Sequence, residues 1–115
     1  MTKKKVNQFL KEFKTKKKIF QILFRDDRGK NLRTLTALEI TPHQREETLD
    51  NLVYQDYAEG PKKDNFNQIS DLWVFGKNVK DKEIYIKISL GAENNPVICI
   101  SFHIAEHPMT YPLKK

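Results

Sequence analysis

The chain has 115 residues and carries 21 Lys and Arg against 15 Asp and Glu, a formal net charge of +6 at pH 7. This length favours a single domain over residues 1–115 with one hydrophobic core. The lone cysteine, Cys99, excludes an intrachain disulfide framework and a cysteine-rich zinc site. No stretch approaches the roughly 20 apolar residues of a membrane span, and charges interrupt the basic start too early for a secretory signal. We therefore expect a cytoplasmic protein that makes no membrane contact.

The positive charge is concentrated in the N-terminal third. Residues 1–33 hold 12 basic and 3 acidic residues, a balance of +9, whereas residues 34–115 hold 9 basic and 12 acidic residues, a balance of −3. Such a density of Lys and Arg attracts phosphate backbones without reading their sequence, so we expect a polyanionic partner that this segment helps to hold. The simpler interpretation, which we prefer for Lys3 to Lys5, is a solvated helix face with a frayed basic terminus.

The first half of the chain predicts three helices and one strand. We expect an amphipathic helix over residues 5–15, a strand over 19–24, a short helix over 30–38 and a helix from Thr41 to about Leu52. At the last of these, Thr41-Pro42-His43-Gln44 supplies a capping side chain, a first-turn proline and a capping-box partner. The apolar side chains that these helices are expected to use for packing are Val6, Phe9, Leu10, Phe13, Leu32, Leu35, Leu38, Leu49, Leu52 and Val53.

The second half predicts a loop and three strands. Residues 54–70 have no regular period and contain Gly60-Pro61, so we expect a long loop. Strands over 72–75, 83–90 and 97–104 are joined by turn-rich segments, which predicts an antiparallel meander, and the C-terminal HPMTYPLKK should be extended. This order of elements indicates an α+β domain with helices packed on one face of an antiparallel β-sheet.

Alternation along the last two strands predicts which side chains meet. We expect the apolar faces of the two strands to share the core, and these faces comprise Ile84, Ile86, Ile88, Leu90, Ile98, Ile100, Phe102 and Ile104. The other face of the last strand then carries Val97, Cys99, Ser101 and His103. Tyr85 then lies across from His103, with Lys87 and Ser101 beside them. The simpler interpretation of this patch is the polar, water-facing side of a half-buried sheet.

The same patch has the components of a nuclease that works without a metal. Such an enzyme needs a base for the 2′-hydroxyl, an acid for the 5′-oxygen and a cation for the phosphorane. Histidine is the natural acid or base near neutral pH, lysine supplies the charge, and tyrosine donates a hydrogen bond or stacks on a base.

The segments TPHQREETLDNLVYQDYAEGP, DLWVFGK, KEIYIKISL and VICISFHIAEHPMTYP resemble the bacterial MqsR-like toxins of the motility quorum-sensing regulator family. The resemblance covers about residues 30–112 and implies an mRNA interferase of RelE-like fold, the toxin of a type II toxin–antitoxin system. It implies cleavage of single-stranded mRNA without a metal or other cofactor. It also implies neutralisation by a cognate helix-turn-helix antitoxin, and leaves open whether the ribosome takes part.

Carried over by position, the resemblance assigns the family's strand tyrosine to Tyr85 and the adjacent lysine to Lys87. The last-strand lysine is replaced by His103, which leaves open whether that position transfers a proton or supplies a cation. The family's glutamine falls on Val74, which cannot form a hydrogen bond. The family's loop lysine falls near Glu59, a candidate base, and Lys62 and Lys63 follow it as RNA-binding candidates.

Further candidates come from the residues alone. Lys77 and Arg25 are expected RNA contacts, and His107, just before Pro108, is a weaker candidate than His103 for the active face. His43 is expected at the surface and Trp73 in the core. Two hypotheses follow: a metal-independent endoribonuclease toxin acting at Tyr85, Lys87 and His103, or a non-catalytic basic module that binds RNA or a protein partner.

Overall fold

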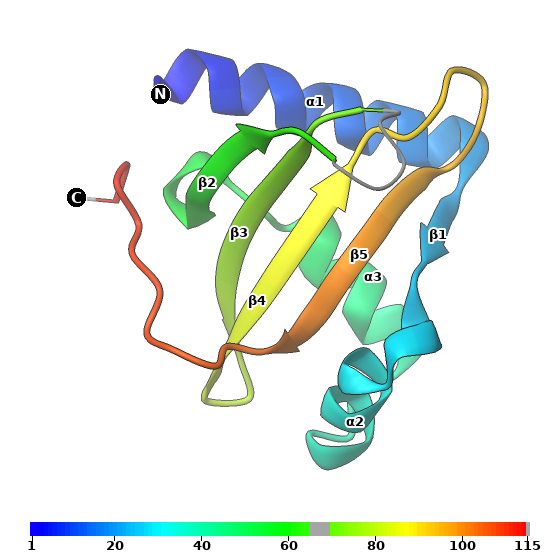
Figure 1. Cartoon of the computed structure of the whole chain (residues 1–115), viewed down its shortest axis with the longest axis vertical. Coiled ribbons are helices and arrows are strands. Elements are labelled where there is room, and N and C mark those ends of the chain that lie inside the picture. The colour runs from blue at the N-terminus through cyan, green and yellow to red at the C-terminus, as the bar shows by residue number, and fades with distance from the viewer. Residues whose placement is uncertain (65–69, 115) are drawn as a thin grey trace.

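The computed structural model describes residues 1–64 and 70–114, except for the side chain of Arg28, and has an α+β architecture (Figure 1). In these ranges the chain forms three α-helices, two short 3₁₀ helices and one five-stranded sheet. Their bounds are α1 Lys3–Phe20, β1 Ile22–Phe24, η1 Asp26–Arg28, α2 Lys30–Ala37, α3 Pro42–Asp50, η2 Tyr54–Asp56, β2 Tyr57–Lys62, β3 Leu72–Val79, β4 Lys82–Ser89 and β5 Val97–Ile104.

The sheet is mixed, with the strand order β1-β5-β4-β3-β2. Strands β2 to β5 pair antiparallel, as expected for the meander, but β1 pairs parallel with β5 through Ile22 and Val97. The prediction of a purely antiparallel sheet is therefore wrong at this edge. A three-residue strand that returns to the sheet after a long helix leaves too weak a pattern to reveal its partner.

One face of the sheet carries the hydrophobic core. Helices α1 and α3 lie behind the sheet in Figure 1 and pack on this face. Phe9 of α1 stacks on Trp73 of β3 with ring centroids 4.3 Å apart, and Trp73 is partly buried against the core, as expected. The side chains of Phe13, Leu49, Leu52, Phe75, Ile84, Ile86, Ile88 and Phe102 are completely buried there. Each such burial contributes about 1.5–3 kcal/mol, so α1 is an integral part of the fold.

Helix α1 is longer than the sequence pattern suggests. It begins after Thr2, whose side chain accepts a hydrogen bond from Lys5 N, and it continues through Ile19 and Phe20, which were expected in a strand. Ile19 is 65% exposed, so this apolar run is not a buried strand. Within the described residues, no helix is both long enough and apolar enough to cross a membrane, α1 included.

Helix α2 has the expected position, and Leu35 and Leu38 pack against the core as predicted, but the third leucine does not and the most buried side chains are polar. Leu32 is 49% exposed, whereas Asn31 and Thr34 are buried against β5. The Asn31 side chain accepts a hydrogen bond from Phe102 N and donates one to Ile100 O, and Thr34 Oγ1 accepts one from Ile104 N. The helix thus supplies hydrogen-bond partners to backbone groups of β5 that lie beyond the end of β1. Polar side chains are needed for this role, and the spacing of the leucines does not reveal it.

Helix α3 begins as predicted. Thr41 Oγ1 accepts a hydrogen bond from Gln44 N, and the Gln44 side chain accepts one from Thr41 N, which completes the capping box. Leu49 and Leu52 are buried, but Val53, which was expected to join them, is 44% exposed.

The predicted loop over residues 54–70 contains a strand. Residues 65–69 lie outside the described residues, but Tyr57–Lys62 form β2, which pairs with β3 at the edge of the sheet. The register shifts twice along this pair, and the Gly60-Pro61 peptide bond is cis. Proline and irregular pairing suit an edge strand, and they hide the period of two on which strand prediction depends.

A β-bulge in β5 changes which residues reach the core. Lys87 pairs with Ser101 but Ile88 pairs with Cys99, so Ile100 is an extra residue. Val97 and Cys99 are consequently buried in the core, where Ile98 and Ile100 were expected. Alternation alone cannot predict this reversal, because one inserted residue exchanges the two faces.

Candidate active site

Tyr85 and His103 form a ring pair on the face of the sheet opposite the core. The predicted register is confirmed here: Tyr85 of β4 pairs with His103 of β5, and Lys87 pairs with Ser101. The two rings stack with centroids 5.3 Å apart and an interplanar angle of 16°. Lys87 Nζ lies 5.9 Å from the centre of the Tyr85 ring. Three of the predicted catalytic side chains therefore lie together on one face.

The backbone fixes the proton position on the His103 ring. Nδ1 lies 3.0 Å from the carbonyl oxygen of Ile104, and a carbonyl oxygen can only accept a hydrogen bond. Nδ1 therefore carries the hydrogen, and in the neutral ring Nε2 keeps its lone pair. This arrangement prepares Nε2 of His103 to accept a proton.

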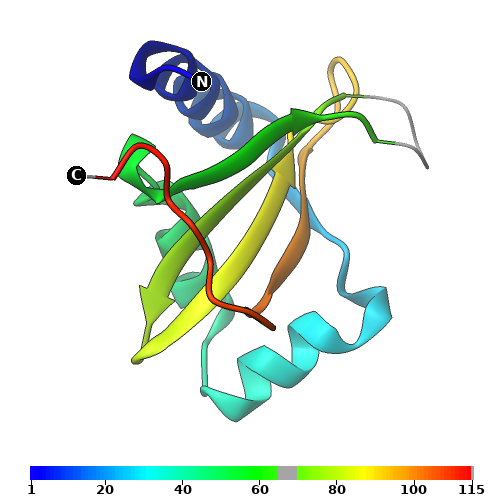
Figure 2. The same cartoon turned by 60° about the vertical axis from the view of Figure 1, so that its left-hand side comes forward.

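The C-terminal strap, which we define as residues 105–114, crosses this face of the sheet instead of leaving it open. Figure 2 shows it in red, passing in front of β3. Between the strap and the sheet lies a cleft of about 600 Å³. Its lining comprises Tyr85, Lys87 and His103 from the sheet, Ala58 and Glu59 from β2, Lys30 from α2, and Glu106, His107, Pro108, Met109 and Thr110 from the strap.

The strap is anchored at Glu83 and Gly76. One carboxylate oxygen of Glu83 accepts a hydrogen bond from Met109 N at 3.0 Å, and the other accepts one from the Tyr111 hydroxyl at 2.6 Å. The Tyr111 hydroxyl and the Met109 sulfur lie against Gly76, where a side chain would collide with both. Glycine is needed at this position because the strap approaches the β3 backbone so closely.

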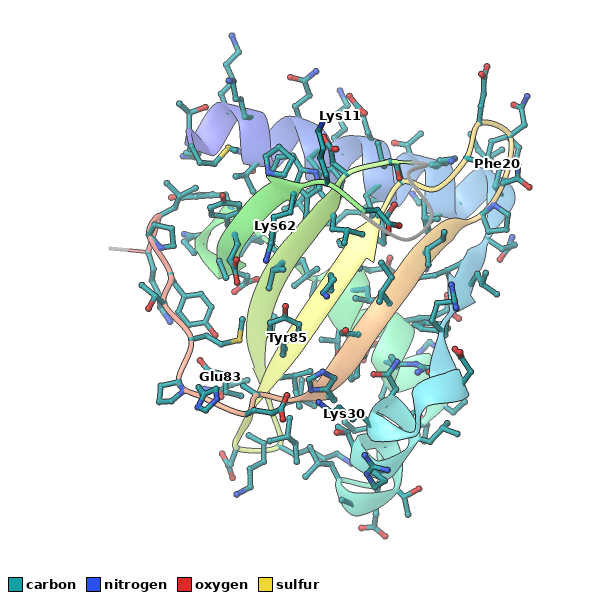
Figure 3. All side chains as sticks on the ribbon, in the orientation of Figure 1. Lys11, Phe20, Lys30, Lys62, Glu83 and Tyr85 are labelled. Carbon is teal, nitrogen blue, oxygen red and sulfur yellow. The ribbon has the colours of Figure 1, made fainter. Side chains whose placement is uncertain are left out.

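Charged groups border the ring pair on both sides, as Figure 3 shows for Lys62 and Lys30 around Tyr85. On β2, Lys62 Nζ lies 3.0 Å from a carboxylate oxygen of Glu59, and both side chains are half exposed. Burial and the negative charge of Glu59 raise the pKa of Tyr85, and the positive charge of Lys62 partly offsets this. Tyr85 is therefore a neutral phenol at physiological pH and can donate a hydrogen bond.

The opposite end of the cleft is closed by an ion pair. Lys30 Nζ of α2 lies 2.9 Å from Glu106 of the strap. The hydrogen bond and charge of Lys30 lower the pKa of Glu106, and the nearby imidazoles of His103 and His107 act in the same direction. Glu106 is therefore an anion that lies close to both histidines.

The predicted RNA-binding residues divide between cleft and periphery. Lys62 lies beside the cleft, and Lys63 follows it at an exposed position. Lys77 does not reach the cleft: its ammonium contacts Asp56 and the Asn51 carbonyl, and its side chain lies on the core side of the sheet. Arg25 follows β1, at the opposite edge from β2, and pairs with Asp27.

Sequence patterns did not reveal Lys30, Glu106 or the course of the strap. The only indication in the sequence was the prediction of His107 as a weaker candidate for the active face, and its position in the cleft supports that prediction.

Val74, at the position where the MqsR-like toxins carry glutamine, is fully buried and offers no side-chain hydrogen bond. Cys99 is buried in the core, where desolvation raises the pKa of its thiol to about 12. It is therefore not a nucleophile.

The described residues contain no group of three or more His, Cys, Asp or Glu side chains placed to hold a metal ion. Comparison with known proteins adds no assignment. No protein-family model matches the chain, and no curated protein and no solved structure is significantly similar to it. The functional argument therefore depends on the cleft itself.

Proposed function

We propose that the protein is a metal-independent endoribonuclease of the MqsR-like, RelE-like kind, the toxin of a type II toxin–antitoxin system that cuts single-stranded mRNA. The observation that carries the proposal is the stacked Tyr85–His103 pair, with Lys87 beside it, on the floor of a cleft of about 600 Å³. An imidazole prepared to accept a proton, a cation and a neutral phenol together supply a base, a charge for the phosphorane and a hydrogen-bond donor for phosphodiester cleavage by the 2′-hydroxyl.

Each side chain has a defined role in this chemistry. Nε2 of His103 removes the proton from the 2′-hydroxyl, whose oxygen attacks the phosphorus. Lys87 stabilises the negative charge that develops on the phosphorane oxygens. The Tyr85 phenol donates a hydrogen bond to the phosphate or supports a nucleobase by stacking. Glu59 is held by Lys62 at the rim, where it tunes Tyr85 and is less suited than His103 to act as the base.

Cleavage of single-stranded RNA in the presence of a chelator tests the reaction. We expect the wild-type protein to leave a 2′,3′-cyclic phosphate and a 5′-hydroxyl, and we expect His103→Ala to lose about 10²–10⁴-fold in rate, the usual contribution of a general base. His43→Ala is the matched control, because that imidazole lies on α3 with its side chain 87% exposed. RNA binding without cleavage by the wild-type protein would favour the non-catalytic module instead.

Expression in bacteria tests the toxin. Wild-type protein should arrest growth and deplete mRNA, and His103→Ala and Tyr85→Phe should relieve the arrest at equal levels of folded protein. A cognate helix-turn-helix antitoxin, co-expressed from a neighbouring gene, should restore growth. Normal growth with all three folded proteins contradicts the toxin proposal, whereas full toxicity of both variants contradicts only the assigned site.

A further inference from the structure

The C-terminal strap brings a second histidine to the same cleft. His103 projects from the sheet and His107 from the strap, and both line the space above Tyr85 and Lys87. His107 directly follows Glu106 in the chain, and both residues line the same cleft as His103. Cleavage of a phosphodiester needs a base on one side of the phosphorus and an acid on the other, and His103 alone supplies only the first.

The position of His107 is held from both sides. Glu106, the preceding residue, pairs with Lys30 of α2, and Pro108, the next one, restricts the backbone before it to extended conformations. Met109 N is then bonded to Glu83, and Tyr111 is bonded to the other oxygen of the same carboxylate. An otherwise irregular segment is thereby held on both sides of His107, an exposed residue that lines the cleft.

We propose that His107 is the general acid of the RNA cleavage, acting across the cleft from His103 as the general base. This inference rests on the proposed endoribonuclease function. Nε2 of His103 takes the proton of the 2′-hydroxyl while the 2′-oxygen bonds to phosphorus. The bond from phosphorus to the 5′-oxygen breaks, and that oxygen takes a proton from His107. The products are a 2′,3′-cyclic phosphate and a 5′-hydroxyl, and water restores both imidazoles to their starting forms.

Other groups in the cleft are less suited to donate this proton. The other candidates include Lys30 and Lys87, but an ammonium group is ordinarily a much weaker acid than imidazolium, and burial and the charge of Glu59 raise the pKa of Tyr85. Glu59 and Glu106 are anions bound to lysines. Imidazolium is the acid matched to neutral pH.

A substrate with sulfur in place of the bridging 5′-oxygen separates acid catalysis from a structural role. A thiolate leaves without a proton, so a variant that lacks only the acid regains activity on this RNA. We expect His107→Ala to cut ordinary RNA about 10²–10⁴-fold more slowly than wild type and to approach the wild-type rate on the sulfur substrate, placed at the cleavage site mapped with wild-type protein. His103→Ala should stay slow on both substrates, and His43→Ala should match wild type on both.

The pH dependence gives a second readout. The base must be neutral and the acid protonated, so wild-type cleavage should rise and then fall with pH, and His107→Ala should lose the alkaline fall. The charged and titratable groups that line the cleft with His107, namely Lys30, Glu59, Tyr85, Lys87, His103 and Glu106, are unchanged in this variant.

The outcomes distinguish the two proposals. Wild-type protein that cuts no RNA overturns both of them. If wild type cuts and folded His107→Ala cuts equally well, or its loss is not repaired by the sulfur substrate, the assignment of His107 fails and the endoribonuclease remains.

Discussion

Two charged residues act on the pKa of the Tyr85 phenol: the carboxylate of Glu59 and the ammonium group of Lys62. Burial and the Glu59 charge raise its pKa, and Lys62 lowers it. Removing the carboxylate in Glu59→Gln should therefore lower the pKa of Tyr85, and Lys62→Gln should raise it. Titration of isotope-labelled tyrosine by NMR measures both shifts, with Tyr85→Phe identifying the resonance.

The same shift has a consequence for stability. Because folding raises the phenol pKa above its ordinary value of about 10, the unfolded chain loses this proton first as pH rises. Tyr85 thus contributes to the unfolding free energy in full below about pH 10, the phenol pKa of the unfolded chain. This contribution is lost as the pH rises through the higher phenol pKa of the folded protein. The unfolding free energy of Tyr85→Phe should fall less steeply above about pH 10 than that of wild type. Equal slopes, or no response of the phenol pKa to Glu59→Gln, contradict this account of the cleft's electrostatics.

At the residue scale, the sequence predicts the pairing of Tyr85 with His103, but it does not predict which residues at the start of β5 are buried. Tyr85 and His103 could be paired because the register is unbroken where residues 84–87 of β4 pair with residues 101–104 of β5. Val97 and Cys99 could not be placed, because the bulge at Ile100 depends on how two strands twist together and leaves no mark in the period. Asn31 was missed for another reason: its importance comes from backbone groups of β5 that are distant in sequence.

At the element scale, the strap is the feature that turns a sheet face into a cleft. It was expected only as an extended segment, since a chain with two prolines and no period carries no information about what it crosses. The glycine beneath it offers a direct test. Gly76→Ala places a methyl group where the Tyr111 hydroxyl and Met109 sulfur lie, while the strand conformation itself tolerates alanine.

We expect Gly76→Ala to detach the strap without unfolding the sheet. Hydrogen bonds to a charged group contribute about 1.5–3 kcal/mol each, and each 1.4 kcal/mol changes a population tenfold. Loss of the Tyr111 bond to Glu83 should therefore speed proteolysis within residues 105–114 by about tenfold or more, in the regime where cleavage follows the open population. Asn78→Ala, at an exposed position on the same strand, is the control. Equal proteolysis of both variants would show that the strap does not depend on Gly76.

At the scale of the whole molecule, the +6 charge of the chain is distributed differently from what its sequence suggests. The N-terminal third was expected to hold the polyanion, but α1 packs on the core face, opposite the cleft. Several of its lysines serve docking: Lys14 donates to Leu52 O, Lys16 to Ala92 O, and Lys17 pairs with Glu46 and Asp50. The lysines around Tyr85 are Lys87 of β4, Lys62 of β2 and Lys30 of α2, and only the last of these belongs to the N-terminal third (Figure 3).

Two double variants with the same change in net charge separate local contacts from the general field. Lys30→Gln with Lys62→Gln removes cations beside the cleft, and Lys4→Gln with Lys5→Gln removes exposed cations of α1. The ion pairs of Lys30 and Lys62 are half exposed and contribute little stability, so both proteins should fold.

Binding is measured with 2′-O-methyl RNA, which lacks the attacking hydroxyl. For a single strand, the slope of log affinity against log salt falls by about 0.7 for every lysine–phosphate interaction that is removed. The slope of the cleft variant should therefore be lower by about 1.4, and the α1 variant should keep the wild-type slope at a modestly reduced association rate. A slope lowered equally in both variants would show that RNA also contacts the lysines of α1, as the charge of the N-terminal third predicts.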